Sequence, residues 1–142
     1  MLDVSHKAPT RRTAVALGTI HMKADTLRRV RTNTLVKKDV LQTARAAGVL
    51  AAKRTPDLIP DCHPIRLDQV EVTFEFQDDP PRVEVRASTR AEDRTGVEME
   101  ALTAAAVACL TVYDMAKAVD PGMVIGPLRL LRKTGGKSDY AA

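Results

Sequence analysis

The sequence predicts an α+β fold, a ferredoxin-like βαββαβ sandwich in which a four-stranded antiparallel sheet carries helices on one face. Three observations support this prediction. Segments 70–76 and 83–88 alternate apolar and polar residues on either side of an Asp-Asp-Pro-Pro turn, a pattern typical of a β-hairpin. One helical segment precedes the hairpin and a second follows it. Strand-like segments nearer the two ends of the chain complete the order.

The part of the chain before the hairpin contains one predicted strand and two predicted helices. The strand covers 13–22, where both alternating sets of residues are apolar, so that both of its faces suit a covered position. A short helix is expected over 24–30, with Asp25 as its N-cap. Small and apolar residues recur at three- and four-residue steps over 39–54, which predicts a helix capped by Asp39. The small side chains of this helix would let another backbone approach closely.

The hairpin itself predicts which face of the sheet the helices cover. Its first strand places Phe74 and Phe76 on an apolar face, and Glu71 and Glu75 on the opposite face. The apolar face is expected to pack against the helices. The polar face of the return strand is basic, so acidic-to-basic pairs are expected across the hairpin. An RNA-binding sheet would need aromatic residues where the glutamates stand, which argues against that function.

A long helix and a last strand follow the hairpin. Thr95 and Glu98 have the spacing of a capping box, so the helix is expected to begin here and to continue to about Val119. It is apolar over most of its circumference and is therefore expected to be deeply buried. The residues expected in its interior are Met99, Leu102, Thr103, Ala106, Val107 and Leu110. A strand over 123–131 and a flexible basic tail over 133–142 complete the prediction.

Length and composition fit a single domain over 1–142, in which residues 1–10 form an N-terminal arm. With 44% hydrophobic residues the chain can fill a sizeable core, which excludes intrinsic disorder as its main description. No stretch approaches about 18 uncharged apolar residues, so no membrane partner is expected. The first residues lack the apolar segment of a signal peptide. A cytoplasmic protein with reduced cysteines is therefore expected.

Charge and aromatic content favour a small anionic ligand. The chain has 22 Lys and Arg against 18 Asp and Glu, a formal net charge of +4. This moderate basic bias suits an anionic ligand without establishing nucleic-acid binding. Two Phe, two Tyr and no Trp leave few side chains on which bases can stack. A small phosphorylated ligand is favoured over a nucleic acid.

Two groups of charged residues are candidates for chemistry. Asp114 and Lys117 lie three positions apart near the end of the long helix and project from one face. They form either a surface ion pair or a charged pair at a pocket edge, where pKa values shift more easily. Lys37 and Lys38 precede the N-cap Asp39, where cations oppose the helix dipole unless an anion is shared. Two solvated loop lysines are the alternative.

Two loop motifs carry further candidates. His63 follows Cys62 between two prolines, and zinc is disfavoured because no other Cys or His has the spacing of a zinc finger. An acid–base or ligand-contacting histidine is favoured, with a structural histidine as the alternative. The motif from Gly135 to Ser138 is similar to the end of a phosphate loop. It lacks that loop's first glycine, because Leu131 stands there, and is expected to be a flexible basic arm.

Four segments go beyond these general patterns, namely DVSHK at 3–7, DVLQTARAAGVLAAKRTPDLIPDCHP at 39–64, RTGVEMEALTAAAVACLTVYDMAKAVD at 94–120 and MVIGPLRLLRKTGGKS at 123–138. Together they resemble the cyclic pyranopterin monophosphate synthases, the C proteins of molybdenum cofactor biosynthesis. The resemblance implies a lyase that converts 3′,8-cyclo-7,8-dihydroguanosine 5′-triphosphate to cyclic pyranopterin monophosphate and releases diphosphate. It also implies a homohexamer, a trimer of dimers with active sites between subunits.

The motifs of that family assign roles to residues of this chain. The catalytic aspartate matches Asp114, and the two catalytic lysines match Lys117 and Lys37. The residues that match substrate contacts are Asp61, Cys62, His63, Met99, Glu100, Arg12 and Lys133. The resemblance implies no metal ligands and no organic cofactor, and a Mg²⁺ ion that accompanies the triphosphate is not derivable from the sequence. Closely packed cations would lower the pKa of Lys117 or Lys37 and give a neutral amine.

Three positions depart from the family pattern. Asp61 replaces an apolar residue, Lys38 replaces a glycine, and the glycine that usually precedes Asp139 is missing. These departures keep an alternative open, a non-catalytic relative of the same fold that binds a nucleotide. The family's set of Lys37, Asp114 and Lys117 favours the enzyme, because a binder needs no carboxylate among phosphate-binding lysines.

Overall fold

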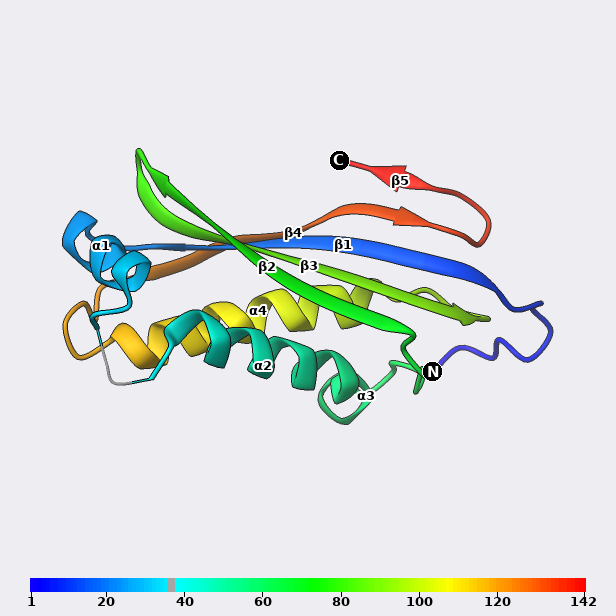
Figure 1. The fold of residues 1–142 in the computed structure, drawn as a ribbon. Coiled ribbons are helices and arrows are strands. Elements are labelled where there is room, and N and C mark those ends of the chain that lie inside the picture. The colour runs from blue at the N-terminus through cyan, green and yellow to red at the C-terminus, as the bar shows by residue number, and fades with distance from the viewer. Residues whose placement is uncertain (36–37) are drawn as a thin grey trace.

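The computed structural model describes residues 1–35 and 38–142, in which a twisted antiparallel sheet carries two long helices on one face (Figure 1). The strands are β1 (Thr10–His21), β2 (Gln69–Asp78), β3 (Pro81–Asp93), β4 (Val124–Thr134) and β5 (Tyr140–Ala141), in the spatial order β2-β3-β1-β4-β5. The helices are α1 (Ala24–Thr32), α2 (Val40–Lys53), α3 (Thr55–Leu58) and α4 (Glu98–Ala116). The α+β class and the ferredoxin-like order of the first four strands are confirmed, and the sheet has five strands rather than four.

The fifth strand comes from the segment that was expected to be a flexible tail. β4 continues to Thr134, the chain turns at Gly135 and Gly136, and β5 pairs with β4 through Tyr140 opposite Lys133. The two glycines have φ angles of 94° and 76°, which residues with a side chain rarely adopt. The Gly-Gly pair therefore makes this turn possible. A strand of two residues shows no alternation in the sequence, which is why periodicity missed it.

The hairpin of β2 and β3 is confirmed, and its apolar face lies toward the helices. The Phe74 ring contacts the guanidinium of Arg45 on α2 at 5.4 Å, and the Phe76 ring contacts that of Arg31 on α1 at 5.0 Å. The expected acidic-to-basic pairs are wrong, because the register places Glu75 directly opposite Glu84 and Glu71 opposite Ser88. Arg82 and Arg86 of β3 lie opposite Gln77 and Thr73.

The N-cap predicted from the sequence is confirmed for α2 and is wrong for α1 and α4. Asp39 caps α2 and accepts a hydrogen bond from the backbone N–H of Gln42 at 3.0 Å, as expected. Lys23 occupies the N-cap of α1, and Asp25 instead pairs with arginines in the next turn of that helix. The capping box at the start of α4 does not form, because Val97 is the N-cap and makes no side-chain cap bond.

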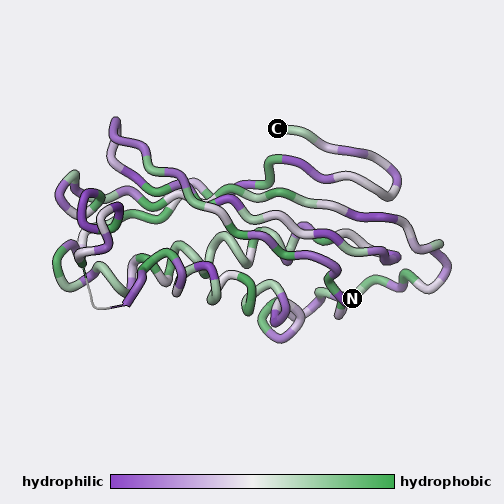
Figure 2. The backbone as a smooth tube through the Cα atoms, viewed as in Figure 1, coloured by the Kyte–Doolittle hydropathy of each residue, from purple (hydrophilic) through white to green (hydrophobic). Residues whose placement is uncertain are grey.

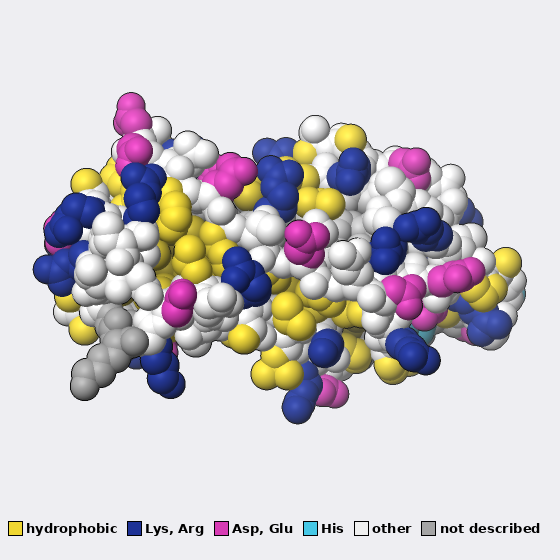
Figure 3. All heavy atoms as spheres, in the orientation of Figure 1, with side chains coloured by type: hydrophobic (Ala, Val, Ile, Leu, Met, Phe, Trp, Pro, Cys, Tyr) yellow, Lys and Arg dark blue, Asp and Glu magenta, His cyan; other side chains and the backbone are white. Residues whose placement is uncertain are grey.

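The burial of α4 differs from the expected one. Of the residues expected in its interior, Leu110 is 56% exposed and Met99 is also exposed, whereas the others are half-buried and Leu102 packs against the core. The fully buried side of the helix consists mainly of alanines, together with Cys109, Val112 and Glu100. A helix that is apolar all round does not reveal from its periodicity which side faces the core. Figure 2 shows this apolar character along α4, and Figure 3 shows hydrophobic side chains exposed on the helix side of the molecule.

The small side chains of α4 let this helix approach both the sheet and α2 closely. A Cβ atom added to Gly18 of β1 would lie 3.0 Å from Cys109 Sγ and 3.2 Å from the carbonyl oxygen of Ala105. A Cβ atom added to Gly48 of α2 would lie 3.1 Å from the carbonyl oxygen of Ala104. The expectation that the small residues of α2 admit another backbone is therefore confirmed.

Within the described residues, α4 is also the one helix that is long and apolar enough to cross a membrane by length and composition. The sequence prediction concerned uncharged stretches, and α4 carries Glu98, Glu100 and Asp114, so that prediction is not contradicted. The core helix of a soluble protein passes the same test, and α4 packs against α2, β1 and β3.

We predict that Gly18→Val lowers the free energy of unfolding by about 1–3 kcal/mol, because its side chain must displace Cys109 or the backbone of α4. Chemical denaturation measures the effect. Gly122→Val is the matched control, since no atom lies within 4 Å of its added Cβ. Equal stability of the two variants would contradict the close contact between β1 and α4.

Candidate functional site

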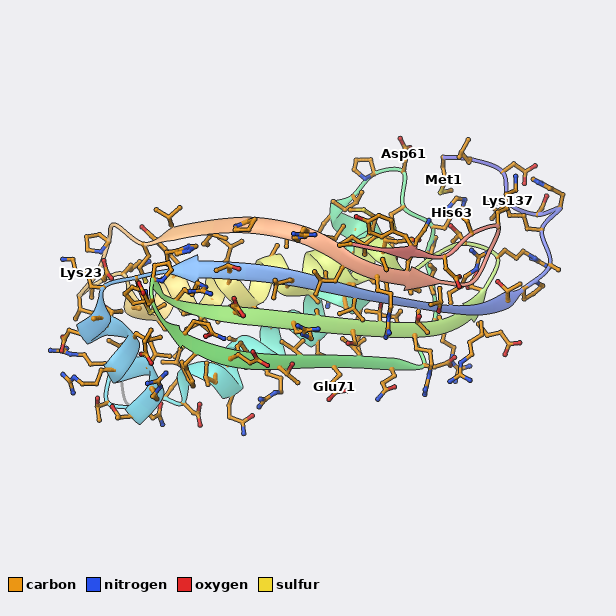
Figure 4. All side chains as sticks on the ribbon, turned by 90° about the horizontal axis from the view of Figure 1, so that it is seen from above. Met1, Lys23, Asp61, His63, Glu71 and Lys137 are labelled. Atoms are coloured by element: carbon orange, nitrogen blue, oxygen red, sulfur yellow. The ribbon has the colours of Figure 1, made fainter. Side chains whose placement is uncertain are left out.

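The residues singled out by the sequence lie at two ends of the subunit. The N-terminal cluster, at the start of α4, consists of Arg12, Asp61, Cys62, His63, Met99, Glu100 and Lys133. The C-terminal pair consists of Asp114 and Lys117. Glu100 and Asp114 are 14 positions apart on one helix, which separates them by about 21 Å. Figure 4 shows Asp61, His63 and Lys137 at one end and Lys23, which precedes α1, at the other. Lys37 lies outside the described residues.

The C-terminal pair forms an exposed ion pair in the single subunit. Lys117 Nζ lies 2.8 Å from Asp114 Oδ1, and the two side chains are 58% and 70% exposed. This hydrogen bond and the charge of Asp114 raise the pKa of Lys117 above its usual value. The expectation that neighbouring cations make Lys117 a neutral amine is wrong for this subunit, because its nearest partner is a carboxylate.

Glu100 is a carboxyl group enclosed at the start of α4. The residue is 2% exposed, and its two carboxylate oxygens lie 3.8 and 3.9 Å from Cys62 Sγ. Burial, together with the nearby charges of Glu98 and Asp93, raises the pKa of Glu100 to about 7. Burial and the charge of Glu100 also raise the pKa of Cys62, whose thiol donates to the carboxylate. Cys62 is therefore held as a neutral thiol, and Glu100 is poised to exchange a proton near neutral pH.

His63 is held by the N-terminal arm. Its Nε2 atom lies 2.6 Å from the carbonyl oxygen of Leu2. A carbonyl oxygen only accepts, so Nε2 carries the proton, and in the neutral ring Nδ1 holds the free lone pair. Asp61 is mostly exposed and contacts the amino group of Met1 at 3.2 Å. The arm is fastened again by Arg94, whose Nε donates to the carbonyl of Lys7 at 3.0 Å.

A basic pocket of about 270 Å³ adjoins these residues. It is lined by Lys7, Arg12, Thr95, Gly96, Glu98, Lys133, Gly135, Lys137 and Ser138. Four cations and two hydroxyl groups therefore surround a space with one carboxylate among its described lining residues. Such a set of donors suits an anion with several charged oxygens, as in a di- or triphosphate. The pocket thus joins Arg12 and Lys133, as the sequence predicted, to Lys7, which the DVSHK motif contained without an assigned role.

The two walls of this pocket come from opposite ends of the chain. Arg12 is fixed on β1 through a hydrogen bond from its Nη2 to the carbonyl of Arg94 at 3.2 Å. The Gly135–Gly136 turn packs against Arg12, and a Cβ on either glycine would collide with β1 or with Arg12 itself. Asp139 closes the turn by accepting from the Gly135 N–H at 3.1 Å. The motif at Gly135 to Ser138 is therefore an ordered wall of the pocket.

A second pocket of about 470 Å³ continues from the first. It is lined by Met1, Leu2, Val4, Lys7, Asp61, His63 and Thr95, so the two pockets share Lys7 and Thr95. An elongated ligand could therefore place a polyphosphate in the basic pocket and its other end beside His63. In the described part of the chain, no group of three or more His, Cys, Asp or Glu residues is arranged to hold a metal ion.

We predict that Glu100→Gln stabilises the protein at high pH relative to the parent. Between pH 4.5 and about 7 the unfolded carboxyl is ionised while the buried one stays protonated, so the parent loses stability as the pH rises. The variant avoids this loss, which is on the order of 3 kcal/mol above pH 7. Denaturation of both proteins at pH 5 and pH 8 measures the difference. A difference in stability that is the same at both pH values would contradict the buried carboxyl's shifted pKa.

Comparison with known proteins identifies the family of this chain. Residues 1–136 match the MoaC family. Proteins named cyclic pyranopterin monophosphate synthase are similar over nearly the whole chain. They include those of Methylobacterium sp. (57% identity, all of this chain and 89% of the relative), Brucella ovis (55%, 99% and 86%) and Heliobacterium modesticaldum (53%, 99% and 88%). The chain belongs to the MoaC family.

Proposed function

We propose that this chain is a cyclic pyranopterin monophosphate synthase, a lyase of molybdenum cofactor biosynthesis. Its substrate is 3′,8-cyclo-7,8-dihydroguanosine 5′-triphosphate, and its products are cyclic pyranopterin monophosphate and diphosphate. The names of its relatives support this activity. The observation that carries it is the basic pocket, which continues past Lys7 and Thr95 into a pocket lined by His63.

The residues around these pockets suit the steps of this reaction. Closing the cyclic phosphate forms a bond from a substrate hydroxyl to the α-phosphorus and breaks the bond to the departing diphosphate. The hydroxyl proton needs a base, and the negative charge on the diphosphate needs cations. Arg12 and Lys133 can stabilise the diphosphate, and His63 Nδ1 and Glu100 can accept or donate protons. These groups need no organic cofactor, and a Mg²⁺ ion could enter with the triphosphate.

The complete site includes the C-terminal pair of a second subunit. Within one subunit Asp114 and Lys117 lie about 21 Å along α4 from the N-terminal cluster, beyond the reach of any side chain. A homo-oligomer, a hexamer built as a trimer of dimers, would join the two. The exposed Leu50 of α2 and Leu110 of α4 support such an assembly, because it would cover apolar side chains. The proposal places the enzyme in the cytoplasm, in accord with a soluble biosynthetic protein, with neither nucleic acid nor membrane as partner.

We predict that purified protein incubated with the cyclised dihydroguanosine triphosphate releases diphosphate and forms the pterin product. Lys117→Ala should lower the rate at least about 100-fold, since removing a proton-transfer or charge-stabilising group has effects of this size. Lys53→Ala, an exposed lysine at the end of α2, is the matched control and should leave the rate unchanged. Binding of the triphosphate without turnover would instead establish the alternative, a non-catalytic nucleotide-binding relative.

Mixing two inactive variants tests whether a site is shared between subunits. Lys117→Ala damages the C-terminal pair, and His63→Ala damages the N-terminal cluster. The two variants are unfolded together and refolded as a mixture. About a quarter of the parent activity should then return, because about half of the dimers are mixed and one of the two sites in each mixed dimer is intact. No return of activity, with mixed oligomers verified by mass spectrometry, would place both groups in one subunit.

A further inference from the structure

Glu98 is a carboxylate inside an otherwise cationic pocket. Its Oε1 atom lies 3.4 Å from Lys133 Nζ, and the two side chains are partly exposed, at 29% and 37%. It is the one acidic group among the described residues that line the basic pocket, against the cations of Lys7, Arg12, Lys133 and Lys137. A pocket for a polyphosphate gains attraction from each cation and loses some to this carboxylate.

A cap hydrogen bond at the start of α4 does not explain the position of the Glu98 side chain. Val97 is the N-cap, and its side chain makes no cap hydrogen bond. The Glu98 carboxylate turns back over Gly96, where an added Cβ would collide with it. This course brings the carboxylate to Lys133 on β4. The same carboxylate thus lies in the first turn of α4, where a negative charge suits the helix dipole, and beside the pocket's Lys133.

We propose that Glu98 competes with diphosphate for Lys133 and so weakens the pocket's hold on this product. The inference rests on the proposed function, since it concerns the release step of that reaction. A bound phosphate oxygen takes Lys133 from Glu98, and the carboxylate takes Lys133 back as diphosphate leaves. Without Glu98 the four cations would face the product unopposed, and its dissociation would become slower.

Product release limits turnover in many enzymes. Competition between Glu98 and diphosphate for Lys133 therefore affects the steady-state rate. The substrate is also held through its nucleoside-derived part, beside His63, whereas free diphosphate has only the cations. A carboxylate that weakens the contact of phosphate with Lys133 therefore affects product retention more than substrate capture. Glu98 acts in this way through Lys133 and does not need to touch the reacting atoms.

Titration calorimetry with inorganic diphosphate tests the proposal without any need for turnover. Glu98→Gln removes the charge and keeps the shape, and should bind diphosphate about fivefold more tightly than the parent, as expected for a partly exposed ion pair. Glu98→Asp, whose carboxylate is drawn back from Lys133, should change in the same direction. The matched control is Glu92→Gln on the exposed side of β3, which changes the net charge equally and should bind as the parent does. Equal affinity in Glu98→Gln and Glu92→Gln, weaker binding in Glu98→Gln, or no binding by any variant would overturn the proposal.

Two further measurements distinguish an effect through Lys133 from an effect on the whole pocket, and the role of Glu98 from the proposed function. In a Lys133→Met background, Glu98→Gln should no longer change diphosphate affinity, because the cation for which the two compete is gone. An unchanged fivefold effect there would show that Glu98 acts on the pocket as a whole and not through Lys133. With the triphosphate substrate, Glu98→Gln should keep the single-turnover rate and lower the steady-state rate. If the parent forms no pterin, the proposed function fails, while the calorimetric result still decides the role of Glu98.

Discussion

The close approach of α4 to β1 and α2 is the constraint on which the rest of this subunit depends. It requires small side chains at both surfaces: alanines and Cys109 on the helix, Gly18 in the strand and Gly48 in the neighbouring helix. Because mostly small residues face inward, larger apolar residues such as Leu110 remain exposed on the outer side of α4. The same helix carries Glu100 at one end and Asp114 at the other, so its rigid docking fixes the separation of the two groups of site residues.

Much of the fold follows from local patterns. Alternation identified the strands of the hairpin, and the Asp39 cap with its small-residue repeat identified α2. Three features could not be obtained in this way. The buried side of α4 is decided by packing distance, since every side of that helix is apolar. The pairing of Glu75 with Glu84 depends on a register that alternation leaves undetermined, and β5 has only two residues.

The site was predictable in composition but less so in arrangement. Motifs of the family singled out Arg12, Lys133, His63 and Glu100, and the structure brings these to one end of the subunit. The predicted long helix already places Glu100 near its start and Asp114 near its end, and the rise per residue of a helix gives their separation. The raised pKa of Glu100 is a property of burial, which depends on how Cys62 and the loop before β2 fold over it.

The construction of the basic pocket from the two ends of the chain also constrains when that pocket can exist during folding. β1 and β4 meet through pairs such as Thr13 and Thr134, which are 121 positions apart and joined by a side-chain hydrogen bond. Contacts of such long sequence separation form only after a large loop has closed, so they carry a high entropic cost and form slowly. A nascent or truncated chain that has the hairpin and both long helices but lacks β4 would therefore present Arg12 without the opposite wall. The basic pocket therefore forms only when β4 and the turn after it are in place.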